Sequence, residues 1–140
     1  MVSLTEILGF KEGFHYYITV FLSSHYPRMV RVVKLAIDTG STYTTLIAGN
    51  IRMPPSVFNR LEPDIPVLAF GGNVIPKIME HVTFIFIDRK GKPYPIHVEK
   101  VHVINRMVVE ECDGVLGMDV ISRFKKTTIN EQNQTIIFEA

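Results

Sequence analysis

The chain has 140 residues, of which 46% are hydrophobic and 21% are charged, and its formal net charge is +1. This length and composition are typical of a folded domain with a real core and exclude a disordered segment. The near-zero charge argues against a nucleic-acid partner, whose phosphates require a basic surface. The sequence lacks a run of about 18 apolar residues that would span a bilayer, so no membrane partner is expected.

The amino terminus and the cysteine content favour a cytoplasmic protein. Residues 1–14 contain no basic stretch and no cleavage-like small residues, so no secretory signal is expected. The only cysteine, Cys112, cannot form an internal disulfide, which suits a reducing compartment. We interpret Cys112 as a small packed side chain and not as a nucleophile.

The first half of the chain alternates strand patterns with turn signals. Long strands are predicted over 13–24 and 29–38, and a short one over 44–48. A proline-rich connection, 53–66, follows, and one helical turn is predicted to start at Pro55, because proline is tolerated in the first turn of a helix.

A hairpin is predicted around Gly71-Gly72, because glycine supplies the positive φ that a tight turn requires. Its arms contain Pro66 and Pro76, which cannot donate to a β-ladder. The hairpin is therefore expected to project from the body of the molecule.

The second half returns to strands over 81–88 and 94–105, and a hairpin over 126–140 closes the chain. We interpret the alternating aromatic residues as packed strand faces; they are Phe14, Tyr16, Phe84 and Phe86. No linker or internal repeat is visible, so residues 1–140 are predicted to form a single, mostly β domain.

One helix is predicted to begin near Asp119, which is expected to cap it. Three apolar residues that follow share one helical face: Val120, Ile121 and Phe124.

The stretch LAIDTGSTYTTL places Asp38 at the end of an apolar strand. A carboxylate is costly in such a position, and Gly40 permits an immediate sharp turn after it. Hydroxyl groups surround the acid in the sequence; they belong to Thr39, Ser41 and Thr42. The same residue types are turn formers, so a purely structural Asp38 that accepts backbone N–H bonds is the alternative.

A second motif lies downstream, where Val115-Leu116-Gly117 directly precedes the predicted helix. Together with Asp38-Thr39-Gly40, and with the order of the strands and the hairpin between them, it resembles the retropepsin-like aspartic protease family over roughly residues 13–139. The tail of the chain looks closest to cellular and prokaryotic members, including the DNA-damage-inducible protein type. The resemblance implies an all-β half-barrel with one short C-terminal helix, a flap hairpin and an obligate two-fold homodimer.

The resemblance also implies roles for individual residues. Asp38 matches the catalytic aspartate, Thr39 the residue that braces the two active-site loops across the dimer, and Gly40 the glycine whose carbonyl receives the substrate main chain. The implied substrate-binding residues lie in the same loop and at the flap tip: Ser41, Thr42, Phe70, Gly71, Gly72 and Asn73. Viral members usually carry an acidic residue where this chain has Thr42.

Peptide hydrolysis without a metal needs one base and one acid, and two adjacent carboxylates that share a proton supply both. The chain has only one Asp-Thr-Gly, and we interpret Asp113 as a turn residue and Asp119 as a helix cap. The second carboxylate is therefore expected from another copy of the chain, across a two-fold axis through Asp38. The predicted function is a homodimeric aspartic endopeptidase that acts on peptides or proteins.

Two other functions stay open: a catalytically silent domain that binds peptides or serves as a scaffold, and a structural β-domain. No cofactor and no metal site are expected, because the histidines show no ligand spacing; they are His15, His25, His81, His97 and His102. His97 and His102 are expected to face opposite sides of their strand. The sequence also lacks the signatures of a serine hydrolase and of a phosphate-binding loop.

The chain ends are the expected subunit interface. Residues 135–140 are apolar enough to form it, and residues 2–10 are a second candidate. The spacing of Leu4, Ile7 and Leu8 fits a short amphipathic helix as well as a strand, and the sequence does not decide between them.

Overall fold

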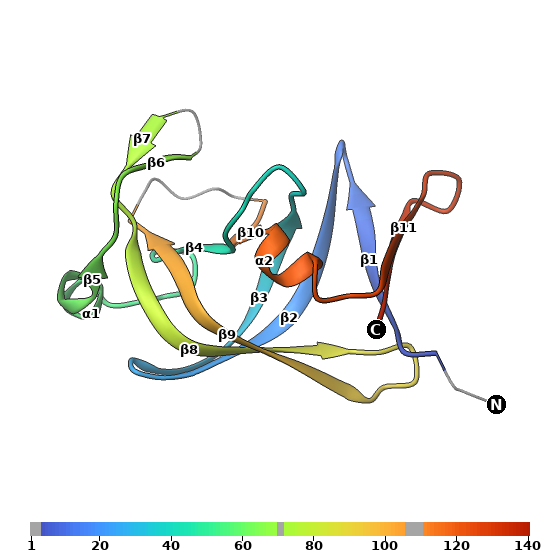
Figure 1. The fold of residues 1–140 in the computed structure, drawn as a ribbon, viewed down its shortest axis with the longest axis horizontal. Helices are drawn as coiled ribbons and strands as arrows, with labels where there is room; N and C mark the ends of the chain where they lie inside the picture. Colours follow the sequence, from blue (N-terminus) through green and yellow to red (C-terminus); the bar gives the residue numbers. More distant parts are fainter. Residues whose placement is uncertain (1–3, 70–71, 106–110) are drawn as a thin grey trace.

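Six strands close into a barrel in the computed structural model, which describes residues 4–69, 72–105 and 111–140 (Figure 1). Each strand in the order β2-β3-β10-β4-β9-β8 is paired with the next, and β8 pairs back with β2. Two of these pairings are parallel, β10 with β3 and β4 with β9. The strands are β2 (His15–His25), β3 (Arg28–Ile37), β4 (Thr45–Ile47), β8 (Lys77–Ile87), β9 (Pro93–Ile104) and β10 (Gly114–Leu116). The predicted all-β architecture is confirmed.

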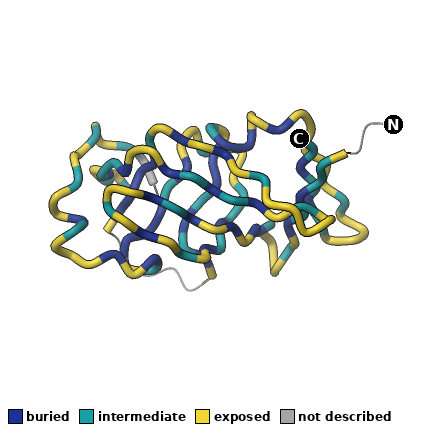
Figure 2. Tube along the Cα trace, turned by 90° about the horizontal axis from the view of Figure 1, so that it is seen from below, coloured by how far each residue is buried: buried dark blue, intermediate teal, exposed yellow. Residues whose placement is uncertain are grey.

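The core lies inside this barrel, because apolar residues recur at every second position of its strands. In β8 the side chains of Val82, Phe84 and Phe86 are fully buried, while the residues between them are more accessible. Figure 2 shows this alternation of buried and exposed positions along the chain. Full burial of one large apolar side chain stabilises the fold by about 1.5–3 kcal/mol, so these strands supply much of the driving force for folding.

A second group of strands extends the sheet beyond the barrel. It comprises β1 (Glu6–Glu12), β11 (Lys126–Asn130) and β12 (Thr135–Glu139). β12 pairs with β1 on one side and with β11 on the other, and the end of β1 pairs with β2. Residues 6–12 therefore form a strand and not a helix.

The apolar residues of β12 belong to the core of the chain itself. Ile136 and Phe138 are 1% and 0% exposed, and both edges of β12 are already paired within the chain. Main-chain pairing with a second copy is thus not available to β12, and a subunit interface at this end of the chain would use other groups.

The remaining elements are not strands of the barrel: α1 (Pro55–Arg60), β5 (Glu62–Pro63), β6 (Val67–Ala69), β7 (Gly72–Val74) and α2 (Met118–Ile121). β6 and β7 form a separate two-stranded sheet that projects from the barrel (Figure 1). Pro66 and Pro76 lie outside its strands, so the projecting hairpin is confirmed. Among the described residues, no helix is long and apolar enough to cross a membrane.

The helix α2 differs from its predicted start. It begins at Met118 with Gly117 as the N-cap, so the expectation that Asp119 caps it is wrong. The carboxylate of Asp119 lies one residue inside the helix and binds a neighbouring loop instead. The predicted apolar face is confirmed by the burial of Val120, Ile121 and Phe124.

The strand β10 crosses behind the loop that joins β3 to β4, and two glycines make the crossing possible. A Cβ atom on Gly117 would lie 2.6 Å from the carbonyl carbon of Tyr43. A Cβ atom on Gly114 would lie 2.2 Å from the carbonyl oxygen of Thr45. Both contacts are with backbone, which cannot rotate away, so the loop and β10 pack at a distance that only glycine allows.

Replacement of Gly117 by alanine is expected to destabilise the protein by roughly 1–3 kcal/mol, because the added methyl group has no free space. Urea denaturation of Gly117→Ala measures this loss. The matched control is Gly40→Ala, whose added Cβ would meet only the Asp38 side chain, at 3.2 Å. Equal denaturation midpoints for both variants would contradict the close-crossing account.

Candidate active site

Asp38 is the first residue after β3, and hydrogen bonds fix its position. Its N–H donates to the carbonyl oxygen of Leu116 (3.1 Å), which continues the pairing of β3 with β10. Its side chain is exposed, and Oδ1 accepts the N–H of Gly40 (2.8 Å). Within the described residues Oδ2 has no hydrogen-bond partner. The backbone bond expected of a turn aspartate is thus present, and one carboxylate oxygen stays open to solvent.

A buried threonine stabilises the Asp38 loop through hydrogen bonds. The hydroxyl of Thr44, whose residue is 0% exposed, donates to Oδ1 of Asp119 (2.7 Å) and accepts the N–H of Gly117 (3.0 Å). The Thr44 N–H donates to both carboxylate oxygens of Asp119 at 3.0 Å. Two N–H groups at the start of α2 donate to the carbonyl oxygens of Ser41 and Thr42, at 2.7 and 3.1 Å. This role of Thr44 was not predicted from the sequence, because Thr44 stands in an unbroken run of hydroxyl-bearing residues, 41–45, that gives it no distinguishing signal.

Asp113, directly before β10, binds the backbone of β3 and β4. Its N–H donates to the carbonyl oxygen of Lys34 (2.7 Å), and its Oδ2 accepts the Lys34 N–H (2.8 Å). The Ile47 N–H donates to the Asp113 carbonyl oxygen (2.9 Å). Asp113 and Asp119 therefore both bind backbone groups of the fold, as structural residues do.

Thr39 lies at the outer end of the same loop. Its side chain is exposed, and it makes no hydrogen bond to any residue that the structure describes. The structure thus brings Asp38, Thr39 and Gly40 together in one exposed turn, in which the Thr39 hydroxyl has no hydrogen-bond partner among the described residues.

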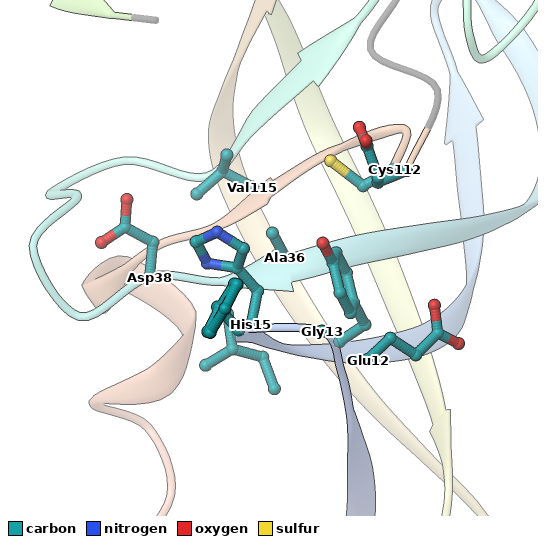
Figure 3. Close-up of a pocket in the computed structure, with 11 residues that line it drawn as sticks. Glu12, Gly13, His15, Ala36, Asp38, Cys112 and Val115 are labelled. Atoms are coloured by element: carbon teal, nitrogen blue, oxygen red, sulfur yellow. The ribbon is translucent and has the colours of Figure 1, made fainter.

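A groove with a volume of about 650 Å³ opens beside Asp38. Figure 3 shows Asp38 on one side of it, with Glu12 and Cys112 on the other and His15 between them. The wall opposite Asp38 is the hairpin between β1 and β2. The lining residues are Glu12, Gly13, Phe14, His15, Tyr17, Ala36, Ile37, Asp38, Glu111, Cys112 and Val115.

The charges in this groove are partly compensated. Glu12 forms an ion pair with Lys34, and this contact raises the pKa of the Lys34 ammonium. Cys112 is buried, as predicted, and burial raises the pKa of its thiol, so it stays protonated and unreactive.

The hairpin wall was missed by the sequence analysis. Phe14 is 92% exposed, so its predicted packing in a strand face is wrong, because it lies in the turn after Gly13 and not in a strand. The packing predicted for Phe84 and Phe86 is confirmed by their complete burial.

A second depression, of about 250 Å³, lies between the Asp38 loop and the projecting hairpin. It contains Ser41 and Thr42, two of the predicted substrate-binding residues, together with Val67 from β6. Tyr43 and His102 also line it, and the centroids of their rings are 4.7 Å apart. His102 is buried and His97 is exposed, but the core-facing positions of β9 change from Ile96 and Val98 to Val101 and Val103, so their expected placement on opposite faces of the strand stays a prediction.

The base of the projecting hairpin is tied to β9 through Asp64. Its Oδ2 lies 2.6 Å from Nζ of Lys100 and 2.9 Å from Nε2 of His102, and its Oδ1 accepts the Ile65 N–H (2.8 Å). Its own N–H donates to the carbonyl oxygen of Pro76 on the other arm (2.8 Å). The Lys100 ammonium, followed by the other donors, holds the pKa of the Asp64 carboxyl well below its usual range.

The predicted flap tip is only partly within the described chain. Gly72 and Asn73 lie in β7, where they pair with Ala69 and Leu68 of β6. Phe70 and Gly71 lie outside the described residues. Strands β6 and β7 lie on the same side of the molecule as the loop between β3 and β4 (Figure 1).

Loss of the Thr44 hydroxyl is expected to weaken the loop brace. Thr44→Val keeps the shape of the side chain but leaves the Gly117 N–H and one Asp119 oxygen without this partner, at a cost of about 1–3 kcal/mol. Chemical denaturation measures the change. Thr42→Val, at an exposed position of the same loop, is the control and should stay close to the parent protein; an equal loss in both variants would refute the bracing role.

The Asp64 contacts predict a specific acid sensitivity. The folded-state pKa of Asp64 lies below its unfolded value of about 3.9. Its stabilising contribution is therefore complete above about pH 5 and is lost as the pH falls from there toward the folded-state pKa. Urea midpoints between pH 2.5 and 6 should fall on acidification in the parent protein. They should be lower at pH 6 and less dependent on pH in Asp64→Asn. The control Glu62→Gln, at an exposed position nearby, should follow the parent curve. A parent-like slope in Asp64→Asn would contradict this prediction.

No protein-family model and no curated protein sequence matches the chain. Among solved structures, the fold is similar to the crystal structure of a retropepsin-like aspartic protease from Rickettsia conorii, with a TM-score of 0.63 and 18% sequence identity over 99% of this chain and 94% of that chain. A further match is the retroviral protease-like domain of Ddi1 from Leishmania major, with a TM-score of 0.46 and 15% identity over 86% of this chain and 92% of that one. By its likeness to the Rickettsia structure, the chain has the all-β retropepsin-like fold.

Proposed function

We propose that the protein is a homodimeric aspartic endopeptidase in which each subunit contributes one Asp38. The observation that carries this proposal is the placement of Asp38 at the end of β3. One carboxylate oxygen is fixed by the Gly40 N–H, and the carboxylate lies exposed beside a groove. A turn aspartate with a purely structural role would not need an open groove next to it.

The second carboxylate must come from a second subunit. Asp113 and Asp119 are occupied by backbone and hydroxyl donors of the fold, so neither is free to form a pair with Asp38. A two-fold axis near Asp38 would bring two copies of the same exposed turn together. The hydroxyl of Thr39, which has no partner in the described part of the chain, would then have a partner loop to bind.

The reaction follows from the chemistry of such a pair. Two carboxylates a few ångströms apart share one proton, so one acts as a base and the other as an acid. The ionised carboxylate takes a proton from a water molecule, whose oxygen attacks the peptide carbonyl carbon, while the protonated carboxyl gives its proton to the carbonyl oxygen. The pair then takes a proton from one hydroxyl of the tetrahedral intermediate and protonates the amide nitrogen. The C–N bond breaks, and an acid and an amine leave.

The substrate is proposed to be an extended peptide that lies between the Asp38 loops and the hairpins. The carbonyl of Gly40 would accept a main-chain N–H, and side chains at alternate positions would enter the groove and the second depression. The hairpin residues Gly72 and Asn73, together with Phe70 and Gly71, would cover the peptide. Ser41 and Thr42 would contact it from the floor.

We also propose that the chain belongs to the retropepsin-like family, beyond its likeness in fold. This rests on Asp38-Thr39-Gly40 at the end of β3 and on Val115-Leu116-Gly117 in the strand that crosses behind it. A place among cellular and prokaryotic members, including the DNA-damage-inducible type, and a cytoplasmic location are part of this proposal.

Substitution of Asp38 by asparagine is expected to abolish cleavage, because an amide can neither take nor give the shared proton. General acid–base catalysis contributes about 10²–10⁴-fold, and the rate should fall by at least that much. The measurement is cleavage of a proteome-derived peptide mixture between pH 4 and 7, followed by mass spectrometry. Glu80→Gln, an exposed acid on β8, is the matched control and should cleave normally.

The same variant tests the shared site. Sedimentation of Asp38→Asn should show a dimer, as for the parent protein, because the substitution preserves the shape of the turn. Residual activity in Asp38→Asn would refute the assignment of the acid. A parent protein that is only monomeric at working concentration would refute the two-subunit site, and peptide binding without cleavage would favour the peptide-binding alternative.

A further inference from the structure

Two histidines and a glutamate converge on the outer face of the barrel, on β8 and β9. His81, His97 and Glu99 each offer one ligand atom, and these atoms all lie within 4.8 Å of one another. All three side chains are exposed, so a solvated ion could reach them. The proposed peptidase does not use them.

The register of the two strands explains why they meet. His81 lies opposite Glu99, between the pairs Glu80–Lys100 and Val82–Val98. His97 pairs with Thr83, two residues further along β8, and is therefore the diagonal neighbour of His81 on the same face. The group was not predicted from the sequence, because His81 on β8 is 16 and 18 positions from His97 and Glu99 on β9, and only the pairing of the two strands brings them together.

The side chains already approach one another. Nδ1 of His81 lies 3.4 Å from Oε2 of Glu99, and the two imidazole rings stack with centroids 5.9 Å apart and planes at 21°. Two ligand atoms that are each about 2.0–2.1 Å from a tetrahedral zinc ion are separated by roughly 3.3 Å. The His81–Glu99 pair therefore has the required spacing, and the exposed ring of His97 has room to close the remaining distance.

One further feature favours a site over a chance pair. Nδ1 of His97 lies 3.1 Å from Oγ1 of Thr83. When Nδ1–H donates to that hydroxyl, the lone pair for a metal is on Nε2, and the ring orientation is held by a second contact, as is usual for histidine ligands. His81 itself has φ 54°, a left-handed conformation that a replacement at this position must tolerate.

We infer that His81, His97 and Glu99 form a binding site for a divalent transition-metal ion of the Zn²⁺ class. Two imidazole nitrogens and one carboxylate oxygen suit such an ion, and three protein ligands leave the fourth position to water. Because all three ligands are exposed and require small rotations, the affinity is expected in the micromolar range. This site is independent of Asp38 and would exist whether or not the protein cleaves peptides.

Calorimetric titration of the full chain, without a histidine tag, with ZnCl₂ at pH 7.5 tests the inference. One Zn²⁺ should bind per chain. Removal of one of three ligands should weaken binding about tenfold or more, in His81→Asn, His97→Gln and Glu99→Gln alike. Asparagine is chosen at position 81 because it tolerates the left-handed backbone. The matched control His25→Gln removes an exposed histidine outside the cluster and should bind as the parent does.

A second readout separates a built site from loose surface binding. Co²⁺ in place of Zn²⁺ should give the intense visible absorption of a tetrahedral ion in the parent protein and in His25→Gln, but not in the three ligand variants. Circular dichroism without metal should show that all variants are folded. No saturable Zn²⁺ binding, or binding that is unchanged in the folded ligand variants, would overturn the inference and leave an exposed ion pair with stacked rings.

Discussion

The structure depends on the close crossing of β10 behind the loop that carries Asp38. Gly114 and Gly117 let the two backbones approach to distances that a Cβ atom would prevent. The crossing places β10 between β3 and β4, so that the Asp38 N–H can bind the carbonyl oxygen of Leu116. The position of Asp38 is therefore set by backbone packing. The hydrogen bond from Thr44 to Asp119 links the Asp38 loop to the helix that follows β10.

The contacts that fix the Asp38 loop do not include all of its polar groups. One oxygen of Asp38 is bound by Gly40, while its other oxygen and the hydroxyl of Thr39 have no partner among the described residues. A single subunit thus presents a well-positioned but incomplete set of groups. In the proposed dimer a second copy completes it. The Lys100 ammonium and the His102 ring keep the pKa of the Asp64 carboxyl low, so the Asp64 contacts at the base of the hairpin are complete down to about pH 5 and weaken below it.

Much of the fold was predictable from local pattern. The period-two burial of β8, the prolines at the ends of the projecting hairpin and the apolar face at Val120 all follow from short-range rules. Features that depend on long-range packing were not predictable. The apolar spacing near the amino terminus fits a helix as well as a strand, and only the pairing with β12 decides for the strand. Asp119 resembles a helix cap in the sequence, and only its contact with Thr44 shows that it binds a distant loop. The same holds for the candidate site, where the sequence points to the Asp38 loop but to neither the hairpin wall at Phe14 nor the cluster around His81.

The central claim is that two subunits share one pair of acids, and the stoichiometry of a transition-state mimic measures this most directly. Native mass spectrometry and calorimetry with a pepstatin-type inhibitor at acidic pH should give one inhibitor for every two chains, with no binding to Asp38→Asn. One inhibitor bound to each chain, or binding that persists in Asp38→Asn, would contradict a site built from two copies of Asp38.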